Sequence, residues 1–178
     1  MAGKKLDSVK YTNMFKAYGA FWRRGFTEWA GTASRSEYWW NVLMNGLIGL
    51  AALFVYFFFA VLGFAVDSEW VIIFGSILVS VPLVIYCLAA LVPWISLIVR
   101  RLHDAGLSSW FMVLYGVGMF CGFLSSLVVA AASPFSRGAL GFAGFLDIIS
   151  FCISIAFFVF ALLPTKVDGN PYHQFNRQ

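Results

Sequence analysis

Four long stretches without a single charged residue dominate this chain. They cover residues 38–66, 70–99, 105–136 and 148–165. A helix needs about 20 mostly apolar residues to cross the hydrocarbon core of a bilayer, which is about 30 Å thick. Because lipid offers no water to backbone polar groups, each crossing segment must be a helix that satisfies its own hydrogen bonds. The sequence therefore predicts an all-α fold, an integral membrane four-helix bundle.

Composition agrees with a membrane class. The chain is 61% hydrophobic and 11% charged, whereas an ordinary soluble domain is about 25% charged. The three cysteines, Cys87, Cys121 and Cys152, lie inside apolar stretches, which indicates small hydrophobic residues rather than a disulfide framework. On such a chain a net charge of +4 favours anionic lipid head groups as partners and argues against nucleic acid.

The uncharged stretches define a layout along the chain. Residues 1–14 are expected to be a flexible N-terminus, 15–30 an amphipathic helix, 31–165 the membrane domain and 166–178 a tail. Within the membrane domain we expect the spans at about 39–65, 70–99, 110–132 and 143–163.

Lysine and arginine set the expected orientation. Seven of them precede the first span, and the first loop, around Asp67 and Glu69, has none. The second loop carries Arg100 and Arg101. By the positive-inside rule, both termini and the 100–109 turn are predicted to be cytoplasmic.

Residues 15–30 carry aromatic side chains at helical spacing. They are Phe15, Tyr18, Trp22, Phe26 and Trp29. Spacings of three and four place these rings on one helix face. We expect an amphipathic helix lying in the membrane interface; the alternative is a helix docked under the bundle as a lid.

The spans contain signals for helix ends and for packing. Ser34 and Glu37 have the spacing of a capping box, which indicates the start of the first span. In the third span Gly118, Gly122, Ser126 and Ala130 recur every four residues. Small residues allow membrane helices to approach closely, so this stripe predicts packing within the chain or contact in a homo-oligomer.

Polar residues within or beside the spans are functional candidates because the membrane makes them costly. They are Asn41, Asn45, Ser126, Asp147 and Ser154. An oligomeric transporter or channel subunit would line its path with them. Asp147 has a second interpretation, a solvated carboxylate at the membrane boundary.

The stretch "RRLHDAGLSSW", residues 100–110, concentrates charge between the second and third spans. Asp104 stands four residues after Arg100 and three after Arg101, so either can pair with it on a helix. Gly106 suits the left-handed position that ends a helix, and Ser108 or Ser109 can cap the next one. These residues predict a tight helical hairpin.

Three stretches, "GTASRSEYWW" at 31–40, "RRLHDAGLSSW" at 100–110 and "DGNPYHQF" at 168–175, resemble the bacterial inner-membrane family called domain of unknown function 805. The resemblance implies a four-span protein of the bacterial inner membrane and brings no activity with it. By the predicted topology the first two stretches share one cytoplasmic edge. We expect a polar network there that locks helix ends and binds an anionic head group or a partner protein. Its expected members are Arg35, Glu37, Arg100, Arg101, His103, Asp104 and Asn170.

The sequence thus favours a non-catalytic membrane component that binds lipid or partner proteins, alone or as a homo-oligomer. The oligomeric transporter is the alternative, and an enzyme acting on lipid through His103 and Asp104 is a third. Neither a phosphate loop nor an H-E-x-x-H motif occurs in the sequence, and neighbouring residues on a helix point about 100° apart, which disfavours a His103–Asp104 dyad. We expect no catalytic residue, no cofactor and, with only His103 and His173 available, no metal site.

Overall fold

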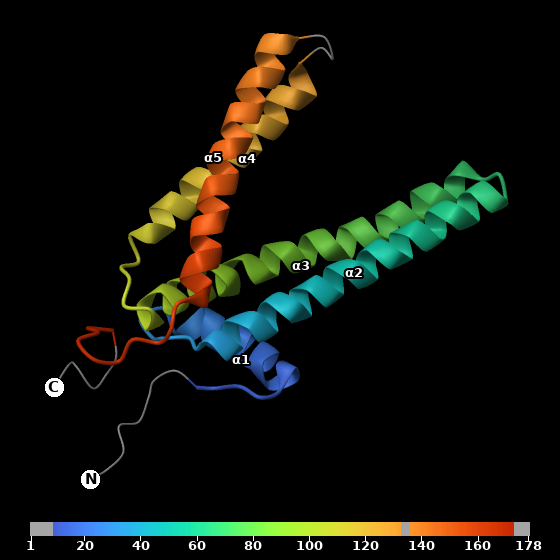
Figure 1. Ribbon diagram of the computed structural model, residues 1–178. Helices are drawn as coiled ribbons and strands as arrows, with labels where there is room; N and C mark the ends of the chain where they lie inside the picture. The colour runs from blue at the N-terminus through green and yellow to red at the C-terminus, as the bar shows by residue number, and fades with distance from the viewer. Residues whose placement is uncertain (1–8, 133–135, 173–178) are drawn as a thin grey trace. The chain divides into compact units, whose positions relative to one another are not determined.

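A computed structural model describes residues 9–132 and 136–172 (Figure 1). The helices in this part of the chain are α1 (Met14–Thr27), α2 (Arg35–Ala65), α3 (Glu69–Asp104), α4 (Phe111–Ala131) and α5 (Arg137–Leu162). No strand occurs among these residues. The four helices α2 to α5 are long and apolar enough to cross a membrane, which confirms the prediction of an all-α, four-span membrane protein.

The described residues form two compact units. Residues 9–29 and 36–98 make the α1–α3 unit, and residues 30–35, 99–132 and 136–172 make the α4–α5 unit. The unit boundaries fall inside α2 and α3, so both helices contribute to both units. The expected flexible N-terminus falls largely on residues 1–8, outside the described residues, as do His173 and the end of the tail stretch.

Helices α2, α3 and α5 are longer than predicted at their charged ends, whereas α4 is one residue shorter at each end. α2 begins at Arg35, directly after Ser34, and α3 continues to Asp104. α5 begins at Arg137 rather than near residue 143. The early part of α5 contains Gly138, Gly141 and Gly144, whose low helix propensity makes this segment look like a loop in the sequence.

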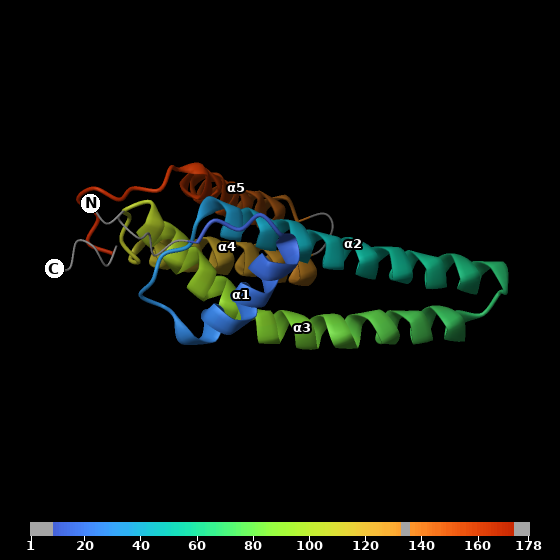
Figure 2. The same ribbon diagram turned by 90° about the horizontal axis from the view of Figure 1, so that it is seen from below.

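In the α1–α3 unit, α2 and α3 form an antiparallel hairpin (Figures 1 and 2). Two glycines allow close contact near its turn. A Cβ atom added at Gly63 would overlap Ile72 Cγ1, and one at Gly75 would overlap Phe59 Cβ. The two backbones therefore approach closely at this end because neither position carries a side chain.

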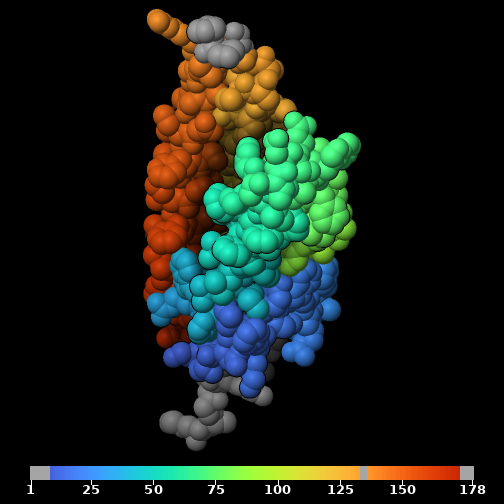
Figure 3. Space-filling model, turned by 90° about the vertical axis from the view of Figure 1, so that its right-hand side faces the viewer, coloured from blue at the N-terminus to red at the C-terminus, as the bar shows by residue number. Residues whose placement is uncertain are grey.

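Helix α1 docks against the same hairpin, and its side chains lie against those of α2 in the space-filling view (Figure 3). Its buried residues are Ala17, Ala20, Phe21 and Gly25. A Cβ at Gly25 would lie 2.6 Å from Pro93 Cα, and the Phe21 ring meets the edge of Trp94 at 5.6 Å. The docking face is thus a small-residue face beside the predicted aromatic face.

The aromatic face of α1 remains partly open. Phe15 is 70% exposed, Phe26 53% and Trp29 45%. The sequence left open whether this helix lies in the interface or docks under the bundle. Tyr18 and Trp22 of the aromatic face contact Tyr86 of α3, so this face is docked in part and exposed at Phe15 and Phe26.

In the α4–α5 unit, glycines of α4 meet α5. A Cβ at Gly118 would lie 3.0 Å from Ile153 Cγ2, and one at Gly122 would lie 3.4 Å from Ser150 Oγ. The contact continues at Ser125, whose buried hydroxyl donates to the Ala143 carbonyl at 3.2 Å. Ser126, which the every-fourth-residue stripe would place there, is exposed. The contact follows spacings of four and three because two helices in prolonged contact repeat about every 3.5 residues.

The C-terminal end of α3 confirms the predicted role of Gly106. Gly106 has a φ of +77°. The Leu107 amide donates to the Leu102 carbonyl at 2.9 Å, and the Gly106 amide donates to the His103 carbonyl at 3.0 Å. This pair of bonds is a Schellman motif, in which a left-handed residue lets the chain reverse over the last carbonyls of the helix.

Candidate functional site

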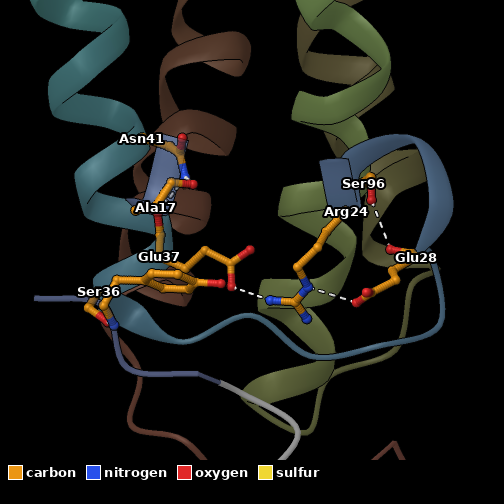
Figure 4. A network of polar contacts seen from close by, with 8 residues as sticks. Ala17, Arg24, Glu28, Ser36, Glu37, Asn41 and Ser96 are labelled. Carbon is orange, nitrogen blue, oxygen red and sulfur yellow. Dashed lines mark hydrogen bonds and ion pairs between the residues drawn. The ribbon is translucent and has the colours of Figure 1, made fainter. Parts of the chain in front are cut away.

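The α1–α3 unit contains a cluster that we call the Arg24–Glu37 cluster (Figure 4). Arg24 Nη1 donates to Glu37 Oε2 at 2.6 Å, and Arg24 Nε donates to Glu28 Oε2 at 2.7 Å. Ser96 Oγ of α3 donates to the Glu28 carbonyl at 3.1 Å. The cluster therefore joins the end of α1 to the beginning of α2 and to α3.

The environment of Arg24 stabilises the charged form of its guanidinium. Burial by itself would lower the pKa of the Arg24 guanidinium, but Glu37 and Glu28 together raise that pKa above its usual value. The Glu37 side chain is 0% exposed, so its carboxylate has exchanged water for this partner. Removing one member of such a pair strongly destabilises the protein, because the other charge is left buried without compensation.

Asn41 and Asn45 extend the polar contacts along α2. Asn41 Nδ2 donates to the Glu37 carbonyl at 2.7 Å and to the Ala17 carbonyl at 3.4 Å. Asn45 Nδ2 donates to the Asn41 carbonyl at 2.7 Å. The Tyr86 hydroxyl donates to Asn45 Oδ1. These two predicted intramembrane residues thus connect α2 with α1 and α3.

The α4–α5 unit contains a second cluster, the Arg101–Asp104 cluster. Arg101 Nη1 donates to Asp104 Oδ2 at 2.5 Å, and the two side chains are 2% and 0% exposed. The same guanidinium donates to the carbonyls of Ala161, from Nε at 3.3 Å and Nη2 at 3.2 Å, and of Leu163. Thr165 Oγ1 donates to Asp104 Oδ2 at 2.7 Å. The end of α3 is thereby bound to the end of α5.

The segment after α5 folds onto this cluster. Asn170 Nδ2 donates to the His103 carbonyl at 2.7 Å and to the Lys166 carbonyl at 2.8 Å. The Lys166 amide donates to the Asp104 carbonyl at 2.9 Å. The His103 ring stacks on Tyr172 with centroids 3.9 Å apart and an interplanar angle of 9°. The described part of the tail is therefore built into the helix end.

The stretches 31–40 and 100–110 meet through backbone groups of the α4–α5 unit. The Ala33 amide donates to the Arg100 carbonyl at 3.0 Å. His103 Nδ1 lies 3.3 Å from the Gly31 carbonyl oxygen. The Arg100 side chain is buried, whereas that of Arg35 is exposed.

Members of the predicted network occur in both units. Arg101, His103, Asp104 and Asn170 come together in the α4–α5 unit, where the Arg100 carbonyl accepts from the Ala33 amide. Glu37 belongs to the other unit, where its partner is Arg24. Sequence reasoning missed Arg24, Thr165 and Tyr172. The sequence held a weak signal for two of these residues. Thr165 ends the last uncharged stretch, and Tyr172 lies in the "DGNPYHQF" stretch.

The remaining candidates lie apart from the clusters. Asp147 is exposed on α5. The hydroxyls of Ser126 and Ser154 donate to carbonyls of their own helices, Gly122 and Ser150. Within the described ranges no group of three or more His, Cys, Asp or Glu side chains is placed to hold a metal ion.

Four apolar helices whose charged ends are tied by buried ion pairs define a multi-pass α-helical membrane protein. Residues 26–174 match the family described as "Protein of unknown function (DUF805)". The chain belongs to this family, as its motifs led us to expect. No curated protein and no solved structure matched the chain.

Glu37 and Glu28 make similar bonds to Arg24 at different degrees of burial. We expect Glu37→Gln to lower the free energy of unfolding by about 3 kcal/mol, because it leaves a buried guanidinium short of charge compensation. Glu28 is 47% exposed, so Glu28→Gln should cost less than about 1 kcal/mol. Denaturant unfolding of the detergent-solubilised protein measures both variants. Equal losses for the two would show that burial does not decide the strength of this cluster.

Asp104 accepts bonds from both Arg101 and Thr165. Asp104→Asn should therefore destabilise the chain by about 3 kcal/mol and release the segment after α5 to proteases. Glu69→Gln, at an exposed carboxylate where α3 begins, is the control and should change stability by less than about 0.5 kcal/mol. Thermal unfolding combined with limited proteolysis tests this, and an unchanged melting temperature and digest for Asp104→Asn would contradict it.

Proposed function

We propose that this chain is a non-catalytic component of the bacterial inner membrane that binds anionic lipid at the cytoplasmic ends of its helices. The observation that carries the proposal is the division of the basic residues into two groups. Arg24 and Arg101 are held by buried carboxylates. Among the described residues the exposed cations are Lys10, Lys16 and Arg23 in the α1–α3 unit and Arg35, Arg137 and Lys166 in the α4–α5 unit.

The exposed faces of α1 support a lipid surface as the partner. Because α1 docks through its small-residue face, Phe15 and Phe26 remain exposed, as do Lys16 and Arg23. Aromatic and basic residues exposed on one helix are typical of a helix at the boundary between head groups and acyl chains. Each cation near an anionic bilayer surface strengthens binding by about fivefold.

The charge distribution supports the orientation. In the α1–α3 unit the exposed cations belong to the segment around α1, whereas the α2–α3 turn carries the exposed acids Asp67 and Glu69. The positive-inside rule assigns the basic end to the cytoplasm. Both termini and the 100–109 turn would then be cytoplasmic.

Cysteine labelling tests this orientation. In a background with Cys87, Cys121 and Cys152 replaced by alanine, Ser68→Cys lies in the α2–α3 turn and Ser109→Cys lies beside α4. An impermeant maleimide added to intact bacterial spheroplasts should label Ser68→Cys at once and Ser109→Cys only after permeabilisation. The reverse order would overturn the orientation.

The non-catalytic part of the proposal rests on how the polar groups are used. His103 is stacked on Tyr172 and faces the Gly31 carbonyl, and Asp104 accepts bonds from Arg101 and Thr165. These contacts suit structural residues better than an acid–base pair. The hydroxyls of Ser126 and Ser154, which a transport path would use, bond to their own helices.

Head-group preference tests the lipid proposal. The full-length protein is reconstituted in vesicles of equal parts phosphatidylglycerol and phosphatidylcholine, extracted, and its retained lipids are counted by native mass spectrometry. We expect wild-type protein to retain mainly phosphatidylglycerol, and the double variant Lys16→Gln, Arg23→Gln to lose this preference. Arg137→Gln, at the other end of α5 from Lys166, is the control and should keep it.

Two results would contradict the proposal. One is equal retention of both lipids by the wild type. The other is a stoichiometric protein partner that co-purifies in place of anionic lipid and is released by the double variant. The first would remove the lipid partner, and the second would replace it with a protein.

A further inference from the structure

The α2–α3 hairpin contains a groove along its length. The two helices are in close contact at Gly63 and Gly75, and hollows lie between them in the part nearer α1. One hollow of about 290 Å³ lies between Asn45 on α2 and Trp94 on α3. The next, of about 370 Å³, shares Ile48, Leu83 and Tyr86 with it and extends to Val55 and Leu78. We call the two hollows together the α2–α3 groove.

The groove has an apolar part that begins at a pair of polar groups. From Tyr86 to Leu78 this part follows eight residues of α3, which corresponds to about 12 Å at 1.5 Å per residue. Asn45 and Tyr86 lie where it begins, and its other end, nearer the α2–α3 turn, is lined by side chains such as Val55 and Leu78. This distribution matches an amphiphile with one polar group and an extended hydrocarbon chain.

The hydrogen bonds around Asn45 and Tyr86 use all but one of the donors there. Tyr86 donates to Asn45 Oδ1, so the Tyr18 hydroxyl, 3.1 Å from that of Tyr86, acts as the donor between the two tyrosines. One N–H of the Asn45 amide is bound to the Asn41 carbonyl. The second N–H of this amide has no acceptor among the residues that the structure describes. The groove therefore offers an uncharged donor to a ligand that supplies an acceptor.

The depth of this donor fits an acyl ester. Trp70, at the far end of α3, is 79% exposed and marks one membrane interface. Tyr86 is sixteen residues further along, about 24 Å away, within a hydrocarbon core of about 30 Å. The donor thus lies close beneath the opposite interface, where the ester carbonyls of glycerophospholipids begin.

We propose that the α2–α3 groove holds one acyl chain of a glycerophospholipid, whose ester carbonyl accepts the remaining N–H of Asn45. A second copy of the chain is the competing occupant. A helix with its side chains is about 10 Å across, and hollows of 290 and 370 Å³ suit a single extended chain better. The same unit exposes Lys16 and Arg23, which suit the phosphate of such a lipid.

Two glycines of α2 provide a matched pair of test variants. Gly49 lines the groove, and a Cβ added there meets nothing within 4 Å, so the backbone has room for a side chain and Gly49→Phe places a ring at the groove. Gly46, on the same helix, also has nothing within 4 Å and is exposed. Gly46→Phe therefore makes the same chemical change outside the groove.

The experiment uses the full-length protein from the mixed phosphatidylglycerol and phosphatidylcholine vesicles described above. Native mass spectrometry at rising collision energy should reveal one lipid on the wild type that resists removal. Gly49→Phe should lose this lipid, and Gly46→Phe should keep it. Asn45→Leu, which removes the donor, should weaken its retention by about fivefold, the effect of one neutral hydrogen bond. Ala52→Phe, which also fills the groove, replaces Gly49→Phe if that variant does not fold.

Several outcomes would overturn the inference. They are a wild type without a resistant lipid, equal retention by Gly49→Phe and Gly46→Phe, and a dimer that Gly49→Phe alone dissociates. The groove acts on the acyl chain, so its variants should leave the preference for phosphatidylglycerol intact. Loss of that preference in the Lys16 and Arg23 variant, with the resistant lipid retained, would support the proposed function independently of the groove.

Discussion

A carboxylate taken out of water at the end of a membrane helix must find compensating charge and hydrogen bonds, and this requirement organises the structure. Asp104 is 0% exposed and accepts from both Arg101 and Thr165. Arg101 in turn donates to the last carbonyls of α5. Two helices in lipid gain no hydrophobic driving force from contact, so their association depends on close packing and on polar contacts. The polar contacts at the helix ends therefore add to the glycine packing in holding these segments together.

The Arg24–Glu37 cluster follows the same principle in the α1–α3 unit. Glu37 stands in the first turn of α2, where negative charge already suits the helix dipole, and Arg24 supplies the counter-charge from α1. Docking of α1 brings this arginine within reach, and the contact of Gly25 with Pro93 makes the docking close. A helix outside the spans thus takes part in fixing where the first span begins.

The sequence predicted what depends on local pattern. Uncharged stretches identified the four spans, and Gly106 identified the end of α3 because its left-handed conformation is a local requirement. The grouping of Arg101, His103, Asp104 and Asn170 was also anticipated from the shared motifs.

What the sequence did not predict depends on how helices dock. The pairing of Glu37 with Arg24 joins residues on different helices, and nothing in their spacing signals it. Ser125 rather than Ser126 faces α5 because helix contact selects a repeat near 3.5, which a four-residue stripe only approximates. The missed residues are therefore those whose positions are set by packing.

The bonds from Arg101 to the end of α5 have a consequence for biogenesis. Arg101 is made early, and its carbonyl partner at Ala161 follows 60 residues later along the chain. At a synthesis rate of about 5–20 residues per second, the end of α3 waits for several seconds with its buried groups incomplete. A nascent chain halted before Thr165 would carry an unfinished polar site at the membrane surface. Completion of α5 is thus also the step that supplies the hydrogen-bond partners at the end of α3.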